Sequence, residues 1–149
     1  MSRPRAAVDT TVIWSGLANP RAAAGRVLDR WYGREFDLLW TDGILEEYRV
    51  KLLGPEYVDT HGNQEGVKEF LTLVEIFGKR VEPASDELLP PIRDEYDRMW
   101  LAASIGGAAL FLVTYDNDFL QDAELVRAMR GRGTRIVKPT HFHRELDRL

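Results

Sequence analysis

One apolar run of the chain ends in an aspartate: Leu110-Phe111-Leu112-Val113-Thr114-Tyr115-Asp116. A short apolar run followed at once by polar residues is typical of a strand buried inside a sheet. A second run near the start of the chain has the same form, Arg5-Ala6-Ala7-Val8-Asp9-Thr10. Each run therefore predicts a buried strand with an acidic residue, Asp116 or Asp9, at its carboxyl end.

Helical patterns separate the expected strands. Strands are expected at residues 6–8, 36–40, 80–82, 110–113 and 134–137. Helices are expected at residues 21–32, 42–53, 64–77, 93–106 and 123–130, with a last helix that Thr140 caps. Residues 56–63 are expected to form a polar connection, and residues 118–120 a turn. This alternation predicts an α/β fold, a three-layer α/β/α sandwich with a central parallel sheet of about five strands.

Length and composition fit one soluble domain spanning residues 1–149. The chain is 44% hydrophobic and 30% charged, and it has no cysteine, which excludes disulfides and thiolate metal sites. No signal-peptide pattern opens the chain, and no apolar stretch approaches the roughly 18 residues of a membrane span. We therefore expect a cytoplasmic protein that does not associate with membranes.

Four carboxylates are expected to meet at one edge of this sheet. Ligands of open parallel sheets bind beyond the carboxyl ends of the strands, where the strand order reverses, and Asp9 and Asp116 would flank that point. The helices that carry Glu47 and Asp97 begin at the same edge, because each follows a strand. Acidic groups gathered in this way repel one another, and a divalent cation relieves the repulsion. The pattern indicates metal-assisted phosphoryl chemistry.

Helical geometry ranks the carboxylates within each helix. Asp97 falls in the middle of an apolar stripe and Asp94 near its edge, although a first-turn cap is the simpler alternative for Asp97. Glu47 lies nearer the apolar boundary than Glu46, which stays open as the alternative. Hydroxyls at positions 10, 11 and 114 can bond to the carboxylates, and Asp118 is expected to be a turn residue within reach of the site.

Five stretches together resemble the PIN domain family over nearly the whole chain. They are Asp9–Val12, Ile44–Tyr48, Arg93–Leu101, Leu112–Leu120 and Ile136–Phe142. Their order and spacing are similar to those of the family's acidic motifs, and the subgroup they most resemble is the VapC-like toxin of bacterial toxin–antitoxin systems. Three positions depart from the family pattern: Thr11 in place of Asn, Glu95-Tyr96 in place of Pro-Asp, and Tyr115 in place of Gly.

The resemblance implies a Mg²⁺- or Mn²⁺-dependent ribonuclease. Its catalytic acidic quartet would be Asp9, Glu47, Asp97 and Asp116, with Asp9, Asp97 and Asp116 as metal ligands. Asp94 and Thr114 would contact these ligands and hold them in position without binding the metal themselves. It also implies an antitoxin protein as a possible partner and a homodimer.

A basic segment supplies the candidates for RNA contact. Residues 125–144 contain no acid, although the net charge of the chain is −4. We expect Arg130, Arg132 and Arg135 to bind RNA phosphates. The alternative is a solvated helix face followed by a basic tail.

Three other functions are alternatives to the nuclease. A flavodoxin-like signalling domain would suit Lys138-Pro139, but it needs an acid pair after the first strand, where Asp9 stands alone. A haloacid-dehalogenase-type phosphatase needs a second aspartate at the position of Thr11. A PIN fold that acts only as a protein- or RNA-binding module is the third alternative, and the intact quartet argues against it.

Overall fold

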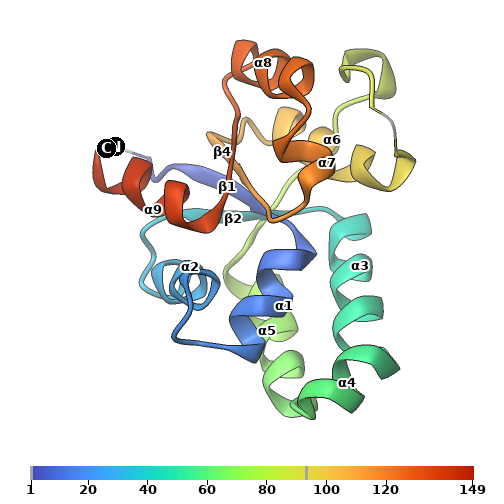
Figure 1. The fold of residues 1–149 in the computed structure, drawn as a ribbon, viewed down its shortest axis with the longest axis vertical. Helices are drawn as coiled ribbons and strands as arrows, with labels where there is room; N and C mark the ends of the chain where they lie inside the picture. Colours follow the sequence, from blue (N-terminus) through green and yellow to red (C-terminus); the bar gives the residue numbers. More distant parts are fainter. Residues whose placement is uncertain (1, 93) are drawn as a thin grey trace.

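A five-stranded parallel sheet forms the centre of the molecule (Figure 1). The structure is a computed structural model, and it describes residues 2–92 and 94–149. The strands are β1 (Arg5–Val8), β2 (Asp37–Trp40), β3 (Lys79–Arg80), β4 (Phe111–Val113) and β5 (Arg135–Val137). Their order is β3-β2-β1-β4-β5, and all neighbours are parallel. The predicted α/β fold with five parallel strands is confirmed.

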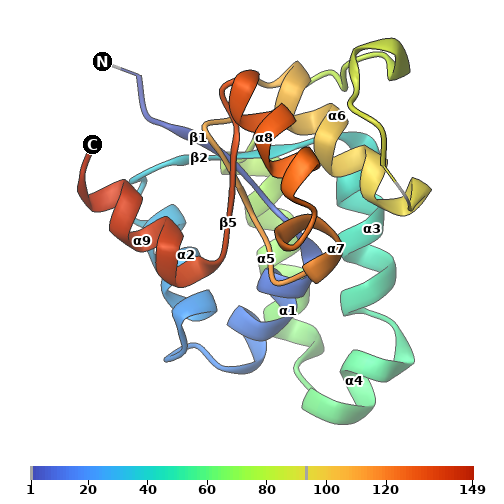
Figure 2. The same ribbon diagram turned by 45° about the horizontal axis from the view of Figure 1, so that its top comes forward.

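Helices cover both faces of this sheet. They are α1 (Thr10–Ala18), α2 (Ala23–Tyr32), α3 (Asp42–Leu52), α4 (Pro55–His61), α5 (Gln64–Phe77), α6 (Arg98–Gly106), α7 (Asn117–Leu120), α8 (Ala123–Gly131) and α9 (Pro139–Asp147). Two 3₁₀ turns, η1 (Asp86–Leu88) and η2 (Glu95–Asp97), lie between β3 and α6. Helices α1, α2, α5 and α9 lie on one side of the sheet, and α6, α7 and α8 on the other (Figures 1 and 2).

The structure contains three helices that the pattern did not predict. Helix α1 follows β1 directly, α4 occupies most of the expected connection at 56–63, and the expected turn at 118–120 belongs to the short helix α7. Pro55 at the start of α4 and Gly62 at its end, with φ of 63°, are favourable terminal residues. The first residue of the helix expected at 93–106 lies outside the described residues; of the others, Glu95–Asp97 form η2 and the α-helix begins at Arg98.

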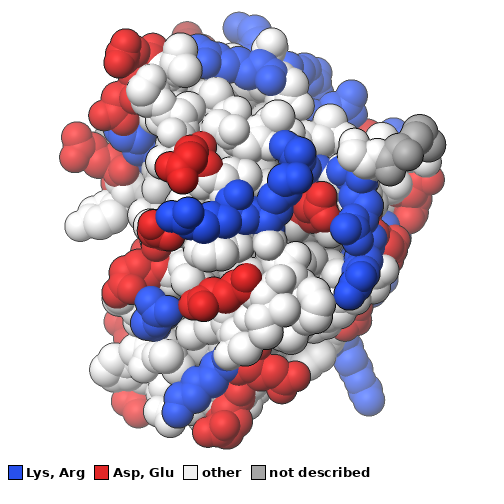
Figure 3. Space-filling model, turned by 180° about the vertical axis from the view of Figure 1, so that it is seen from behind, with Lys and Arg blue, Asp and Glu red and all other residues white. Residues whose placement is uncertain are grey.

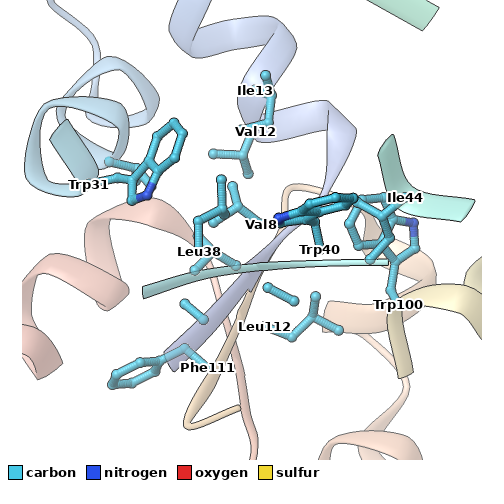
Figure 4. Close-up of a cluster of buried hydrophobic side chains, with 14 of the residues drawn as sticks. Val8, Val12, Ile13, Trp31, Leu38, Trp40, Ile44, Trp100, Phe111 and Leu112 are labelled. Atoms are coloured by element: carbon cyan, nitrogen blue, oxygen red, sulfur yellow. The ribbon is translucent and has the colours of Figure 1, made fainter. Parts of the chain in front are cut away.

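The central strands are fully enclosed. Ala6, Ala7 and Val8 of β1 are all 0% exposed. Apolar side chains from the sheet and from both helical layers pack around them, including Val12, Trp31 and Trp100 (Figure 4). Burying one such aliphatic side chain stabilises the fold by about 1.5–3 kcal/mol. Because β1 is the middle strand, the residue that follows it is held in the protein interior.

The face turned away in Figure 1 carries charges of both signs. Lysine and arginine side chains are interspersed there with aspartate, glutamate and uncharged surface (Figure 3). This face therefore lacks the single-sign basic surface typical of a nucleic-acid interface. Within the described residues, no helix combines the length and the apolar character needed to cross a bilayer.

Candidate metal centre

Asp9 is the most deeply buried carboxylate of the site, at 4% exposed. It ends β1 and caps α1, and its backbone N–H donates to the carbonyl of Val113 on β4 at 3.0 Å. Its Oδ1 accepts hydrogen bonds from both the N–H and the hydroxyl of Thr11, each at 2.6 Å. Its Oδ2 accepts one from the hydroxyl of Thr114. Since each carboxylate oxygen has two lone pairs, Oδ2 keeps one available for a further ligand.

Two hydroxyls connect Asp9 to the loop after β4. Thr11 Oγ1 accepts from the N–H of Tyr115 at 3.2 Å, and Thr114 Oγ1 accepts from the N–H of Asp116 at 2.9 Å. Thr11 thus supplies a side-chain donor to Asp9 where the family usually has Asn. Burial raises the pKa of Asp9, while the hydrogen bonds from Thr11 and Thr114 oppose that rise.

Asp97 lies among the other acids. It is partly buried and forms the N-cap position of α6, where its side chain makes no capping hydrogen bond. Burial, followed by the charges of Asp116, Asp94, Asp118 and Asp9 in that order, raises the pKa of Asp97 to about 7. The placement of Asp97 midway along an apolar stripe was wrong, because the chain forms the 3₁₀ turn η2 up to this residue.

The tightest grouping of carboxylates differs from the expected one. Oxygens of Asp94, Asp97 and Asp118 lie within 4.8 Å of one another, and among the described residues no other three His, Cys, Asp or Glu side chains meet this condition. Asp97 belongs to both the expected and the observed groups. Asp116 caps α7 beside them and accepts from the N–H of Asp118 at 2.9 Å. The sequence placed Asp118 only near the site; the two-residue spacing from Asp116 was the available signal.

Glu47 and Glu46 separate clearly in the structure. Glu47 is partly buried, and its Oε2 accepts from the hydroxyl of Thr10 at 3.0 Å. Glu46 is exposed and pairs with Arg49 at 2.8 Å. Burial, followed by the charges of Asp9 and Glu47, raises the pKa of the adjacent Tyr48 well above its usual range. Glu47 is therefore the glutamate that approaches the carboxyl end of β1.

The three arginines expected to bind RNA lie near the amino ends of the strands, whereas the acidic group lies beyond their carboxyl ends. Arg130 and Arg132 are at the end of α8, and Arg135 begins β5, where it is in register with Phe111 at the amino end of β4. Arg135 is also paired with Glu145 at 2.8 Å. The structure does not bring these arginines to the acidic group, and their role in RNA binding stays a prediction.

The donor set fits a hard divalent cation. Mg²⁺ takes oxygen ligands at about 2.1 Å, so oxygens on opposite sides of it stand about 4.2 Å apart. The 4.8 Å limit of the Asp94, Asp97 and Asp118 oxygens is close to that value, and a small inward shift would bring all three to the ion. Neutralising mutual repulsion at Asp97 would favour that shift.

Comparison with known proteins identifies the family. The profile of the PIN domain matches residues 5–118, which include all the carboxylates of the candidate site: Asp9, Glu47, Asp94, Asp97, Asp116 and Asp118. A protein of Methanocaldococcus jannaschii described as uncharacterised is 24% identical over 143 residues, which span 95% of this chain and 90% of that protein. Because the profile covers well over half of the chain, the protein belongs to the PIN domain family.

Proposed function

We propose that this protein is a metal-dependent endoribonuclease that hydrolyses RNA phosphodiester bonds at the acidic group. Proteins of the PIN domain family are typically nucleases. The observation that carries the proposal is the environment of Asp97, whose pKa is raised to about 7 by burial, by acids from two other parts of the chain and by the neighbouring Asp94. Unpaired carboxylates with strongly shifted pKa values are a signature of functional sites.

We propose a different role for each acid. Asp97 would be the central ligand of Mg²⁺ or Mn²⁺, joined by Asp116 and by the remaining lone pair of Asp9 Oδ2. Asp118 and Asp94 stand close enough to Asp97 to bind directly or through water. A bound cation would lower the pKa of an attacking water and offset the charge of the phosphodiester. Glu47, already held by Thr10, would orient that water with its Oε1.

The toxin role is the finer part of the proposal. The motifs resemble those of VapC-like toxins, so we propose that a cognate antitoxin protein binds this chain and that the chain forms a homodimer. Expression of the protein alone should arrest growth, and co-expression of its cognate antitoxin should restore it. Light scattering should give twice the mass of one chain. Growth that continues at full rate with soluble, active protein would contradict the toxin role.

A cleavage assay tests the nuclease. Single-stranded RNA should be cut in the presence of Mg²⁺ or Mn²⁺ and remain intact with EDTA. Asp97→Asn should abolish cleavage, because it keeps the size of the side chain but removes the charge that binds the cation. Glu46→Gln is the matched control, since Glu46 is exposed and pairs with Arg49. Cleavage by Asp97→Asn equal to that of Glu46→Gln would contradict the assignment.

A further inference from the structure

A polar hollow of about 350 Å³ opens between α7 and the beginning of α9, beyond the carboxyl end of β5. In Figure 2 these two helices flank the point where β5 ends. Its polar lining comes from Asn117, Gln121, Lys138, Thr140, His141 and Arg144, and none of its lining residues is acidic. The hollow therefore offers hydrogen-bond donors and positive charge.

The two cations of this hollow are unpaired. Within the described residues, neither Lys138 nor Arg144 has a carboxylate within 4.0 Å, whereas Arg135 at the other end of β5 is bonded to Glu145. Glu145 also accepts from Arg148 at 3.1 Å and lies 3.3 Å from His141. The nearest acid of α9 is thus already engaged, which leaves Lys138 and Arg144 free for an external anion.

The hollow adjoins the acidic group through α7. Asp116 caps this helix and Asp118 lies in it, while Asn117 and Gln121 of the same helix line the hollow. The backbone joins the two places as well, because the N–H of Thr114 donates to the carbonyl of Val137 at 2.9 Å. A polynucleotide that reached the acids could therefore continue past α7 into the hollow.

We propose that this hollow binds a backbone phosphate of the RNA adjacent to the bond that is cut, with Lys138 and Arg144 as its charged contacts. This inference rests on the proposed ribonuclease function. Arginine presents a fork of N–H donors that matches phosphate oxygens, and lysine adds a compact charge. The arginines at positions 130 and 132 lie at the other end of β5, and neither lines the hollow.

The test is RNA binding in EDTA, which separates binding from cleavage. The double variant Lys138→Gln/Arg144→Gln is compared with Arg130→Gln/Arg132→Gln, which removes the same charge at the other edge. All four residues are exposed, so both variants should fold, and thermal melting confirms it. Binding of a labelled single-stranded RNA is followed by fluorescence anisotropy over a range of salt concentrations.

We expect the first variant to bind about tenfold more weakly at physiological salt, and the magnitude of its slope of log K against log salt to fall by about 0.7, the contribution of one phosphate in a single strand. The second variant should lose less affinity than the first, because Arg130 and Arg132 lie at the other end of β5 from the hollow. Wild-type binding that is undetectable, equal affinities in all three proteins, or a larger loss in the Arg130/Arg132 variant would each overturn the inference.

Cleavage measured on the same proteins separates the two proposals. Suppose that the Lys138→Gln/Arg144→Gln variant binds RNA normally and still shows metal-dependent cleavage. That result would contradict the proposed phosphate site and support the proposed nuclease. RNA binding that depends on Lys138 and Arg144, with no cleavage by the wild type in Mg²⁺ or Mn²⁺, would contradict the proposed nuclease and support the proposed phosphate site.

Discussion

The hydroxyl of Thr114 donates a hydrogen bond to Oδ2 of Asp9, although the two residues are 105 positions apart in the sequence. The same hydroxyl accepts the N–H of Asp116. Thr114 therefore fixes the carboxylate that ends β1 and the backbone of the loop that carries the next acid. Both residues are almost inaccessible to water, so no solvent molecule can easily replace this hydroxyl.

Replacing this hydroxyl should destabilise the protein. Thr114→Val keeps the shape of the side chain but leaves Asp9 Oδ2 and the N–H of Asp116 without a partner, which should lower the free energy of unfolding by about 1–3 kcal/mol. Urea denaturation in EDTA measures the change. Thr11→Val is the control: Thr11 is exposed, so water can replace its hydroxyl and the loss should be smaller. A smaller loss in Thr114→Val than in Thr11→Val would refute this account.

Asp97 should make the metal-free protein less stable as the pH rises. Its pKa is raised from 3.8 to about 7 in the folded state, so folding is favoured by proton uptake between these values. This contribution is fully present below the unfolded value of 3.8 and is lost as the pH rises through about 7. In Asp97→Asn the decline should be shallower, and the variant should be more stable than the wild type at neutral pH. Denaturation in EDTA at a series of pH values checks this, and parallel curves for the two proteins would contradict it.

Ala108 has a strained backbone conformation, and relieving that strain should stabilise the protein. It has φ of 54°, in the left-handed region, although two glycines precede it. Ala108→Gly should raise the free energy of unfolding by about 0.5–1 kcal/mol, because it relieves this strain and the lost methyl group is exposed. Gly107→Ala should do the opposite, since its Cβ would stand 2.7 Å from Leu39 Cδ1. Thermal denaturation of both variants decides, and a destabilised Ala108→Gly would contradict the prediction.

Much of the fold could be predicted from the sequence, because strand and helix patterns alternate and turn residues clearly separate them. The apolar runs before Asp9 and Asp116 identified two neighbouring strands and the edge where these acids lie. Helix α1 could not be read in the same way. It begins with the β-branched residues Thr10 to Ile13, which favour a strand, and it has little amphipathic pattern. The helix forms because Asp9 caps it and the sheet buries its apolar residues.

The acidic site was only partly predictable for a geometric reason. Asp97 ends a 3₁₀ turn and Asp94 caps its start in an extended conformation, so a 100° helical rotation does not describe the directions of their side chains. Asp118 enters the group because α7 turns tightly after Asp116. The sequence could not divide the basic segment by position: β5 has three residues, so Arg135 at its start and Lys138 directly after it stand at opposite ends of the strand. The role of Arg130, Arg132 and Arg135 in RNA binding stays a prediction.

The two neighbouring glutamates should differ in their effect on activity. Glu47→Gln should strongly reduce RNA cleavage with little effect on stability, because Glu47 approaches the site beside Thr10. Glu46→Gln should leave cleavage unchanged, since it disturbs only a surface ion pair with Arg49. Single-turnover cleavage rates in Mn²⁺ provide the comparison. Equal rates for the two variants would show that Glu47 does not take part.

Calorimetric titration of the metal-free protein with Mn²⁺ near pH 7, in buffers of different ionisation enthalpy, tests the metal centre most directly. Asp97 has a pKa of about 7, so part of the protein carries a proton there that a bound cation must displace. We expect saturable binding with proton release in the wild type and in Glu46→Gln, and a large loss of both affinity and proton release in Asp97→Asn. Mn²⁺ binding to Asp97→Asn with unchanged affinity, or no saturable binding to the wild type, would contradict the proposed metal centre.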